Sequence, residues 1–324
     1  MRIAVLDDYA DAFRAASAFA RLGDHEVTVF RDTVKDPDTL VARLADMDAV
    51  VLTQQRSPFP AAVVERLPRL RFVSQTGRNT GHVAIEACTA RGVLVSAGGA
   101  GGPDATAELA WALILASLRH IPEEVQRLRE GHWQGSVGTG LKGKVLGIYA
   151  YGRIGSIVAR VGRAFGMRVV CWGREGSLER ARRDGHEVAA GRGDFFGEAD
   201  VLSLHIALND ATRGLVTAAD LALMKPSALL VNTSRAQIME AGALAAALRQ
   251  GRPGFAAVDV YEEEPVLGAA HPLIGMPNAL CTPHLGYAER GVYEALYETA
   301  VDQILAFAAG TPVNMVNPAA LTRG

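Results

Sequence analysis

The sequence predicts an α/β protein built on a doubly wound parallel sheet of the Rossmann type. The main observation is a strand–turn–helix–strand pattern between residues 145 and 172, with a glycine-rich turn where the first strand meets the helix. Strand and helix patterns also alternate through residues 1–98, and again after residue 200. Repeated units of this kind favour parallel sheets that are covered by helices on both faces.

Residues 1–98 combine short apolar runs, which we expect to be strands, with longer segments of helical periodicity. The expected strands are residues 3–6, 26–30, 49–53, 71–74 and 93–96. The expected helices are residues 10–22, 37–45, 60–67 and 83–91. Gly77 and Arg78 follow the fourth strand, at the carboxyl edge where ligands bind in open α/β sheets. Binding of a small anion and a plain connecting turn are both compatible with this loop.

A glycine run at residues 97–102 indicates a hinge or a domain boundary after this first part. An apolar helix is expected next, at residues 104–119, with Thr106 near its start. Residues 131–143 contain five glycines and Trp133, which predicts a long surface loop. The strand of the glycine-turn unit begins directly after this loop.

The glycine turn itself predicts a dinucleotide-binding site. Gly152 has no Cβ, so the backbone can approach a pyrophosphate, and Gly155 lets the helix pack closely on the strand. The free N–H groups at the start of the helix would then hold the phosphates. An ordinary turn is the alternative, which the flanking strands and helix disfavour. The predicted contacts from the turn are Tyr151, Gly152, Arg153, Ile154 and Gly155.

The residues after the second strand of this unit bear on which dinucleotide binds. An acidic residue about 20 positions after the turn would hold the ribose 2′-hydroxyl of NAD. This chain has Gly173 there, followed by Arg174, whose guanidinium can pair with a 2′-phosphate. We therefore expect NAD(P) and favour NADP. The alternative is that Glu175 contacts the ribose of NAD.

The second half of the chain places ionisable residues after three predicted strands, at residues 229–232, 255–260 and 280–282. Arg235, Glu264 and His284 follow them in that order, so all three are expected at one edge of the sheet. An arginine can clamp a carboxylate, a histidine can exchange a hydroxyl proton near neutral pH, and a carboxylate can orient that histidine. Each residue alone would more often be structural, but their joint position predicts a 2-keto acid reduction or its reverse.

Four more residues are predicted to contact the cofactor. Asp259 lies in a predicted buried strand, and is either hydrogen-bonded structurally or directed at the nicotinamide carboxamide; we favour the second. His205 ends the strand predicted at residues 201–205, beside the cofactor crevice, where a packed residue is more plausible than a catalyst. Thr106 and Thr233 complete the expected contacts.

Four motifs in this order make the chain resemble the D-isomer-specific 2-hydroxyacid dehydrogenase family over nearly its whole length. The motifs are YAYGRIG at the glycine turn, VNTSRAQIMEAGAL around Arg235, AAVDVYEEEP around Glu264, and TPHLGYAE around His284. The ending GTPVNMVNP is similar as well. The resemblance implies a flavodoxin-like substrate domain made of residues 1–98 and 289–324, with a dinucleotide-binding domain of residues 99–288 between them.

The resemblance also implies roles for the residues at the strand ends. Arg235 would bind the carboxylate and keto group of the substrate, His284 would be the acid/base, and Glu264 would support His284. Backbone groups around Gly77 and Arg78 would hold the substrate carboxylate. Asp259 would contact the nicotinamide. The expected activity is that of a glyoxylate or hydroxypyruvate reductase, in a homodimer built around the nucleotide domains.

The chain departs from the family pattern at several positions. Ala150 replaces the first glycine of the turn, Gly173 replaces the usual acid, and Ala236 follows the arginine where glycine is common. Tyr287 would narrow the pocket beside His284. Arg78 adds a charge that could select a substrate with a second acidic group. Arg78→Ala should then weaken a diacid more than a monoacid.

Two other functions on the same fold remain as alternatives. A phosphite dehydrogenase would use a similar Arg–Glu–His set, whereas a formate dehydrogenase is disfavoured because glutamine would be expected in place of Glu264. A dinucleotide-sensing, co-repressor-like binding protein would need a partner groove, which no sequence feature marks. Assays of turnover and of partner capture would separate these possibilities.

Composition argues against several kinds of partner. The 324 residues carry a net charge of −2, so we expect no nucleic-acid binding. The apolar run at residues 109–118 is well short of the ~20 residues that span a bilayer, and no targeting segment precedes the first strand, so we expect no membrane contact. The three cysteines are far apart, which predicts neither disulfides nor a metal site and favours the reducing cytoplasm.

Overall fold

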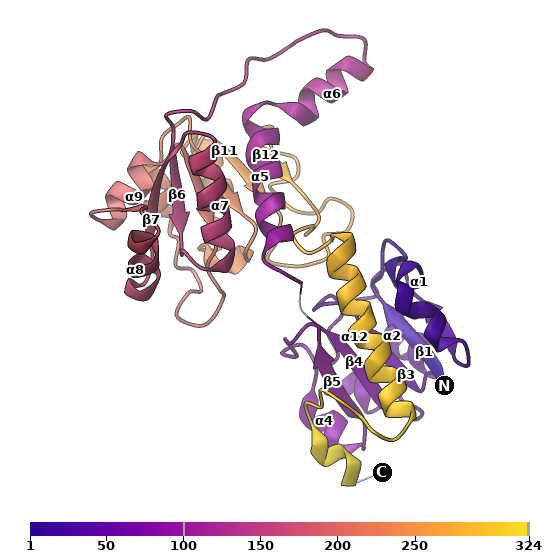
Figure 1. Cartoon of the computed structure of the whole chain (residues 1–324). Coiled ribbons are helices and arrows are strands. Elements are labelled where there is room, and N and C mark those ends of the chain that lie inside the picture. The colour runs from indigo at the N-terminus through magenta and orange to yellow at the C-terminus, as the bar shows by residue number, and fades with distance from the viewer. Residues whose placement is uncertain (100, 323–324) are drawn as a thin grey trace. The chain divides into compact units, whose positions relative to one another are not determined.

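A computed structural model describes residues 1–99 and 101–322 of the chain. It divides into two compact units, which we call the terminal unit (Met1–Gly102 with Ala288–Gly324) and the central unit (Pro103–Tyr287). Both units are layered α/β structures with parallel sheets (Figure 1). The predicted fold class is therefore confirmed. Of the glycine run at 97–102, Ala100 lies outside the described residues.

The terminal unit is built on a five-stranded sheet with strand order β2-β1-β3-β4-β5. All of its strand pairs are parallel. The strands are β1 Arg2–Leu6, β2 Glu26–Val29, β3 Ala49–Leu52, β4 Phe72–Thr76 and β5 Leu94–Gly98. The helices are α1 Ala12–Ala15, α2 Pro37–Leu44, α3 Ala61–Val64, α4 Ile85–Ala90 and α12 Arg290–Ala308, with 3₁₀ turns at Ser17–Leu22 and Pro318–Thr322. This strand order is that of the flavodoxin-like fold.

Both faces of this sheet are buried, as the continuous apolar runs of its strands require. Ile3 and Val5 pack on one face with Tyr297 and Ile304 of α12, which lies along the sheet in Figure 1. Ala4 and Leu6, which alternate with them, pack on the opposite face. The last helix of the chain therefore completes the core that the first strand begins.

The central unit is built on a seven-stranded parallel sheet with strand order β12-β11-β10-β9-β6-β7-β8. The strands are β6 Val145–Tyr149, β7 Arg168–Trp172, β8 Glu187–Val188, β9 Val201–Leu204, β10 Leu229–Asn232, β11 Phe255–Val258 and β12 Ala279–Cys281. The helices are α5 Asp104–Leu118, α6 Ile121–Arg129, α7 Arg153–Ala164, α8 Glu175–Arg183, α9 Arg192–Glu198, α10 Ala218–Leu223 and α11 Ala243–Gln250, with a 3₁₀ turn at Ala236–Ile238. The strand order reverses between β6 and β9, which is the position where Rossmann folds bind their ligands.

The structure differs from the sequence expectations at one expected helix and at three helices that were not expected. The helix expected at residues 10–22 is a single turn, α1, followed by a 3₁₀ helix. Its alanine-rich sequence has helical propensity, but Asp8 caps the first turn and Ala16 then adopts an extended conformation. Helices α6, α8 and α9 were not expected, although the apolar residues Ile121, Val125 and Leu128 give α6 the spacing of an amphipathic helix. Among the described helices, none has both the length and the apolar character needed to cross a membrane.

Candidate active site and cofactor cradle

The glycine turn between β6 and α7 is held in a conformation suited to a phosphate group. Ala150 has a φ of +73°, so it occupies the left-handed region that the first glycine of this pattern normally provides. Gly152 is the N-cap of α7, and no side chain caps the helix. The first N–H groups of α7 are therefore placed to bind an anion rather than a side chain.

The two glycines of the turn have different surroundings. A Cβ built on Gly155 would lie 2.6 Å from the backbone oxygen of Ala150 and 3.1 Å from Ile148, so the fold itself requires glycine there. A Cβ built on Gly152 would meet no atom within 4 Å. Its φ of −102° is also accessible to other residues. The protein thus leaves open space at Gly152, in front of the helix N-terminus, as a bound pyrophosphate would need.

A pocket of about 420 Å³ adjoins the turn. Its walls combine aromatic and aliphatic side chains with polar groups, as is usual for a site that binds a flat heterocycle and a sugar. The lining residues are Tyr149, Ala150, Gly152, Trp172, Gly173, Arg174, Ser177, Arg180, Ile206, Ala207, Asn209, Ala211, Thr212 and Leu215.

The polar end of this pocket is formed by the residues that follow β7. Arg174 and Arg180 both line the pocket, and Arg180 donates a hydrogen bond to the Tyr151 carbonyl at 3.2 Å. Ser177 accepts a hydrogen bond from the Tyr151 N–H at 2.7 Å. Glu175 is not among the lining residues and pairs with Arg182 at 2.5 Å. Glu175, which was the alternative contact for the ribose of NAD, therefore forms an ion pair with Arg182.

Two residues predicted to contact the cofactor carry buried polar atoms without a partner among the described residues. The atoms are the two ring nitrogens of His205 and the hydroxyl oxygen of Thr233. His205 follows β9 and Thr233 follows β10. Unpaired buried polar groups are costly, so they often mark a place where a ligand or water supplies the missing hydrogen bond. With the open space at Gly152 and the adjoining pocket, these atoms fit a dinucleotide lying across the carboxyl edge of the sheet.

We expect the central unit to lose stability as the pH falls from about 6.5 toward 4. Burial lowers the pKa of His205 to about 4, whereas an unfolded histidine has a pKa of about 6.5. Between these values the unfolded chain binds the proton and the folded chain does not, so stability is present above the upper value and is lost on acidification. The loss between pH 7 and pH 5 should be about 2 kcal/mol.

Urea unfolding followed by tryptophan fluorescence measures this loss, because Trp111, Trp133 and Trp172 all lie in the central unit. His205→Gln, which cannot titrate, should remove most of the slope between pH 7 and pH 5. An unchanged slope in this variant would assign the pH dependence to other groups.

Arg235, Glu264 and His284 follow the adjacent strands β10, β11 and β12, so the structure brings them to one edge of the sheet as predicted. Nδ1 of His284 lies 2.5 Å from a carboxylate oxygen of Glu264. The other oxygen of Glu264 accepts the Tyr261 N–H at 2.9 Å, which fixes the carboxylate. Both side chains of the pair are 19% exposed. The arrangement is a base with an orienting carboxylate.

The loop that carries His284 is clamped by Asp259. The Asp259 carboxylate accepts hydrogen bonds from the Thr282 hydroxyl and the Leu285 N–H, both at 2.6 Å, and from the Gly286 N–H at 2.8 Å. Burial raises the pKa of Asp259, and these hydrogen bonds oppose the rise. The carboxylate therefore has the structural role that was the alternative at the sequence level. The contact with a nicotinamide carboxamide stays a prediction.

Further residues complete this clamp. The Thr106 hydroxyl donates to the Gly286 carbonyl at 2.9 Å, so Thr106 supports the loop from α5. The Tyr261 hydroxyl donates to the Thr282 carbonyl at 2.9 Å. The clamp holds His284 at a φ of +53°, which is unfavourable for a non-glycine residue. Tyr287 packs edge-on against the His284 ring, with 5.7 Å between the ring centroids.

The predicted substrate loop lies in the terminal unit, after β4. The Gly77 N–H already donates to the Gly98 carbonyl at 2.7 Å, so this group is used by the fold. The contact of backbone groups around Gly77 and Arg78 with a substrate carboxylate stays a prediction, in which the Gly77 N–H is already engaged and the Arg78 side chain is exposed. Gln54 and Asn79 shape the same edge, where Gln54 donates from its N–H to Thr76 and Asn79 donates to Gln55.

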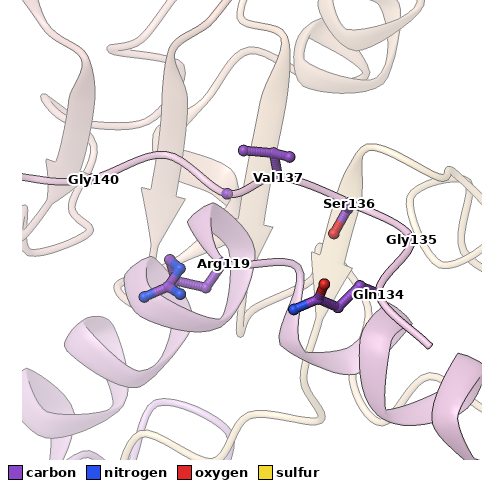
Figure 2. Close-up of a pocket in the computed structure, with 7 residues that line it drawn as sticks. Arg119, Gln134, Gly135, Ser136, Val137 and Gly140 are labelled. Carbon is purple, nitrogen blue, oxygen red and sulfur yellow. The ribbon is translucent and has the colours of Figure 1, made fainter.

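An exposed apolar arm extends from the central unit at α6 and the loop after it (Figure 1). Ile121, Val125 and Leu128 lie on one side of α6 and are all exposed, and Val137 in the loop is 94% exposed. The loop is tied to α6 by the Glu124 carboxylate, which accepts the Gly135 N–H and the Ser136 hydroxyl. Figure 2 shows Arg119 beside this loop. A hollow of about 660 Å³ is lined by Arg119, residues 134–138 and Gly140.

Some residues of the site were not expected from the sequence. Trp172 and Ser177 line the pocket at the end of β7 and in α8, and the sequence analysis predicted no helix at the position of α8. Asn232 was also not expected to be part of the site. Asparagine side chains often accept the backbone N–H two residues further on in an Asx turn, here that of Ser234, so its position was a usable signal. The described residues contain no group of three or more His, Cys, Asp or Glu side chains arranged to hold a metal ion.

The chain is similar in sequence and in structure to several known proteins. A sequence model described as D-isomer specific 2-hydroxyacid dehydrogenase, NAD binding domain, matches residues 111–286. A glyoxylate reductase of Aeropyrum pernix is 38% identical over 86% of each chain, and one of Thermococcus litoralis is 34% identical over 92% of each. An oxidoreductase structure from Ralstonia solanacearum has a TM-score of 0.94 and 49% identity, covering 99% of this chain and 98% of that one. A phosphoglycerate oxidoreductase from Vibrio cholerae O395 has a TM-score of 0.91 and 46% identity, covering 96% and 99%.

Proposed function

The chain belongs to the D-isomer specific 2-hydroxyacid dehydrogenase family, and from this premise we propose that it reduces a small 2-keto acid with NAD(P)H or catalyses the reverse reaction. The cofactor, when bound, supplies or accepts the hydride. The observation that carries the proposal is the His284–Glu264 pair at 2.5 Å, whose residues follow β12 and β11, next to β10 and its turn with Arg235. Reduction of a keto group needs a positioned proton donor, and ligands of open α/β sheets bind at the carboxyl edge where these groups and the dinucleotide cradle lie.

Each residue would have a distinct task in this reaction. Arg235 would clamp the substrate carboxylate and polarise the adjacent keto oxygen. His284 would give a proton from Nε2 to that oxygen during reduction, and take it back during oxidation, because Nδ1 faces Glu264. Glu264 would hold the imidazole in this orientation and stabilise its protonated form. Asp259 and Thr106 would keep the His284 loop in place.

The identity of the keto acid is open to a direct test. Oxidation of NADPH and NADH should be followed with glyoxylate, hydroxypyruvate, pyruvate, phenylpyruvate and phosphohydroxypyruvate in turn. The last acid is included because one similar structure is named a phosphoglycerate oxidoreductase and because Arg78 could contact a second anionic group. Turnover of at least one acid supports the proposal. Tight dinucleotide binding without turnover of any acid would favour phosphite oxidation or a binding protein.

We expect NADPH to be preferred over NADH. Arg174 and Arg180 line the pocket beside the turn, and Glu175 pairs with Arg182, so a 2′-phosphate would meet cations and no carboxylate. Arg174→Ala should lower kcat/KM for NADPH at least tenfold and leave that for NADH within about twofold, since only NADPH loses a charged hydrogen bond. Arg183→Ala, on the same helix but not in the pocket wall, serves as the control. Equal losses for both cofactors would contradict the assignment.

We also propose that the protein is a homodimer joined through the α6 arm. The exposed apolar side of α6, with Val137 and the neighbouring hollow, is a surface that a second copy could cover symmetrically. Val125→Glu combined with Leu128→Glu should shift the protein to the monomer in light scattering after gel filtration. Leu223→Glu places a similar charge on another exposed leucine and should leave the dimer intact. A monomeric wild-type protein would refute the proposal.

A cytoplasmic location, favoured by the free cysteines, stays a prediction.

A further inference from the structure

Asn232, at the end of β10, is a fully buried amide whose hydrogen-bonding groups are all directed at its own turn. Its side-chain oxygen accepts the Ser234 N–H, and its side-chain nitrogen donates to the Arg235 carbonyl, both at 3.0 Å. The backbone carbonyl of Asn232 accepts the Asp259 N–H at 3.0 Å. This residue therefore fastens the turn that carries Arg235 and, separately, the residue that clamps the His284 loop.

The turn has two further anchors, one of which is the Ile238 N–H, which donates to the Arg235 carbonyl at 3.4 Å. The Ser234 hydroxyl donates to the Leu204 carbonyl at 2.7 Å, which ties the turn to the neighbouring strand β9. Arg235 itself has an exposed side chain, and its guanidinium donates to the Ser234 carbonyl at 2.7 Å. The direction in which Arg235 leaves the sheet is thus decided by its backbone, and the Asn232 side chain holds that backbone.

We propose that Asn232 is a positioning residue that sets the place of Arg235 relative to His284, and that it acts on substrate binding only through Arg235. This inference rests on the function proposed above, in which Arg235 clamps a carboxylate. Without the Asn232 amide, the turn would keep the Ser234 anchor and the long hydrogen bond from the Ile238 N–H to the Arg235 carbonyl at 3.4 Å, but it would lose the two shorter hydrogen bonds to residues 234 and 235. A clamp displaced by about 1 Å can cost on the order of a hundredfold in rate.

A matched control exists in the terminal unit. Asn317 is 5% exposed, its oxygen accepts the Val95 N–H at 2.7 Å, and its nitrogen donates to the Val93 carbonyl at 3.0 Å. Like Asn232, it is a buried asparagine whose side chain bonds backbone groups, with one more hydrogen bond from its nitrogen to the Thr89 hydroxyl at 2.9 Å, but it lies beside the amino end of β5, away from the carboxyl edge. Loss of a buried amide as such should affect both asparagines in the same way.

The experiment compares Asn232→Ala, Asn232→Ser, Asn317→Ala and Arg235→Ala in the full-length protein. Oxalate, a planar mimic of a 2-keto acid, is titrated into each protein loaded with dinucleotide, and KM and kcat are measured for the best keto acid. We expect Asn232→Ala to weaken oxalate and raise KM at least tenfold. Serine can accept the Ser234 N–H in a weaker version of the same turn, so it should restore part of the affinity. Dinucleotide affinity, followed by Trp172 fluorescence, should not change.

Combination with Arg235→Ala decides whether the effect passes through the arginine. If Asn232 acts only through Arg235, then Asn232→Ala causes no further loss in an Arg235→Ala protein. A further loss there, an equal loss in Asn317→Ala, or wild-type oxalate affinity in Asn232→Ala would overturn the proposal, as would oxalate binding that does not need Arg235. If Asn232→Ala does not fold, the serine variant provides the same comparison. A wild-type protein that binds oxalate through Arg235 but reduces no keto acid would refute the proposed function alone, and the oxalate titrations would still decide the role of Asn232.

Discussion

Replacing His284 by alanine should lower kcat about a thousandfold and leave the affinity for the dinucleotide unchanged. General acid–base catalysis by a positioned side chain contributes roughly 10²- to 10⁴-fold to a rate. His284 meets the requirement for this role, because Glu264 fixes its Nδ1 and the Asp259 clamp fixes its backbone. The dinucleotide cradle is formed by other residues, after β6 and β7. Steady-state kinetics and a fluorescence titration of the dinucleotide measure the two quantities separately.

His271 provides a matched control for this substitution. Its Nε2 lies 2.9 Å from a carboxylate oxygen of Glu262, so it forms a second histidine–glutamate pair only two residues along the chain from the Glu264 pair. His271 follows β11 in a loop rather than β12, and nothing in the geometry gives it a part in proton transfer. His271→Ala should therefore keep kcat within about threefold of the wild type. Comparable losses in the two variants would mean that the His284 effect is structural.

The two glycines of the turn should respond in opposite ways to the same change. Gly152→Ala should raise the Kd of the dinucleotide at least a hundredfold while changing the free energy of unfolding by no more than about 0.5 kcal/mol. The new methyl group would meet no protein atom, but it would occupy the space proposed for the pyrophosphate. Gly155→Ala should destabilise the central unit by about 2 kcal/mol, because its Cβ would lie 2.6 Å from the Ala150 oxygen.

Urea unfolding by tryptophan fluorescence and calorimetric titration with NADPH test this pair of variants. The comparison is informative because the substituted groups are identical and lie in one turn. If Gly152→Ala binds the dinucleotide normally, the pyrophosphate does not lie at this turn. If instead both variants are destabilised to the same extent, the open space at Gly152 is not present in solution.

The fold could be predicted from sequence largely because the strands are short apolar runs and the glycine turn is specific. The same logic placed Arg235, Glu264 and His284 at adjacent strand ends, since parallel strands end at one edge. Hydrogen-bond partners could not be predicted in this way. The structural role of Asp259 follows from the N–H groups that its carboxylate accepts, which the sequence does not show. Likewise, the Gly77 N–H donates to the carbonyl of Gly98, a residue distant in sequence. Helix α6 was not predicted although its apolar residues recur at helical spacing, and that spacing does not show that its apolar side is exposed in one chain.

The terminal unit is assembled from the two ends of the chain, and this has a consequence for how the protein is made. A ribosome releases the five strands of that unit first, yet Tyr297, which is fully buried against Phe13, is released only after the whole central unit. Until α12 emerges, the sheet face that carries Ile3, Val5 and Phe72 is covered only by residues 12–22 and lacks the packing of α12. The central unit, which is continuous in sequence, can fold during synthesis, whereas the nascent N-terminal sheet must wait with an apolar face partly exposed. Slow translation of the last third of the message would therefore prolong the period in which this chain depends on chaperones.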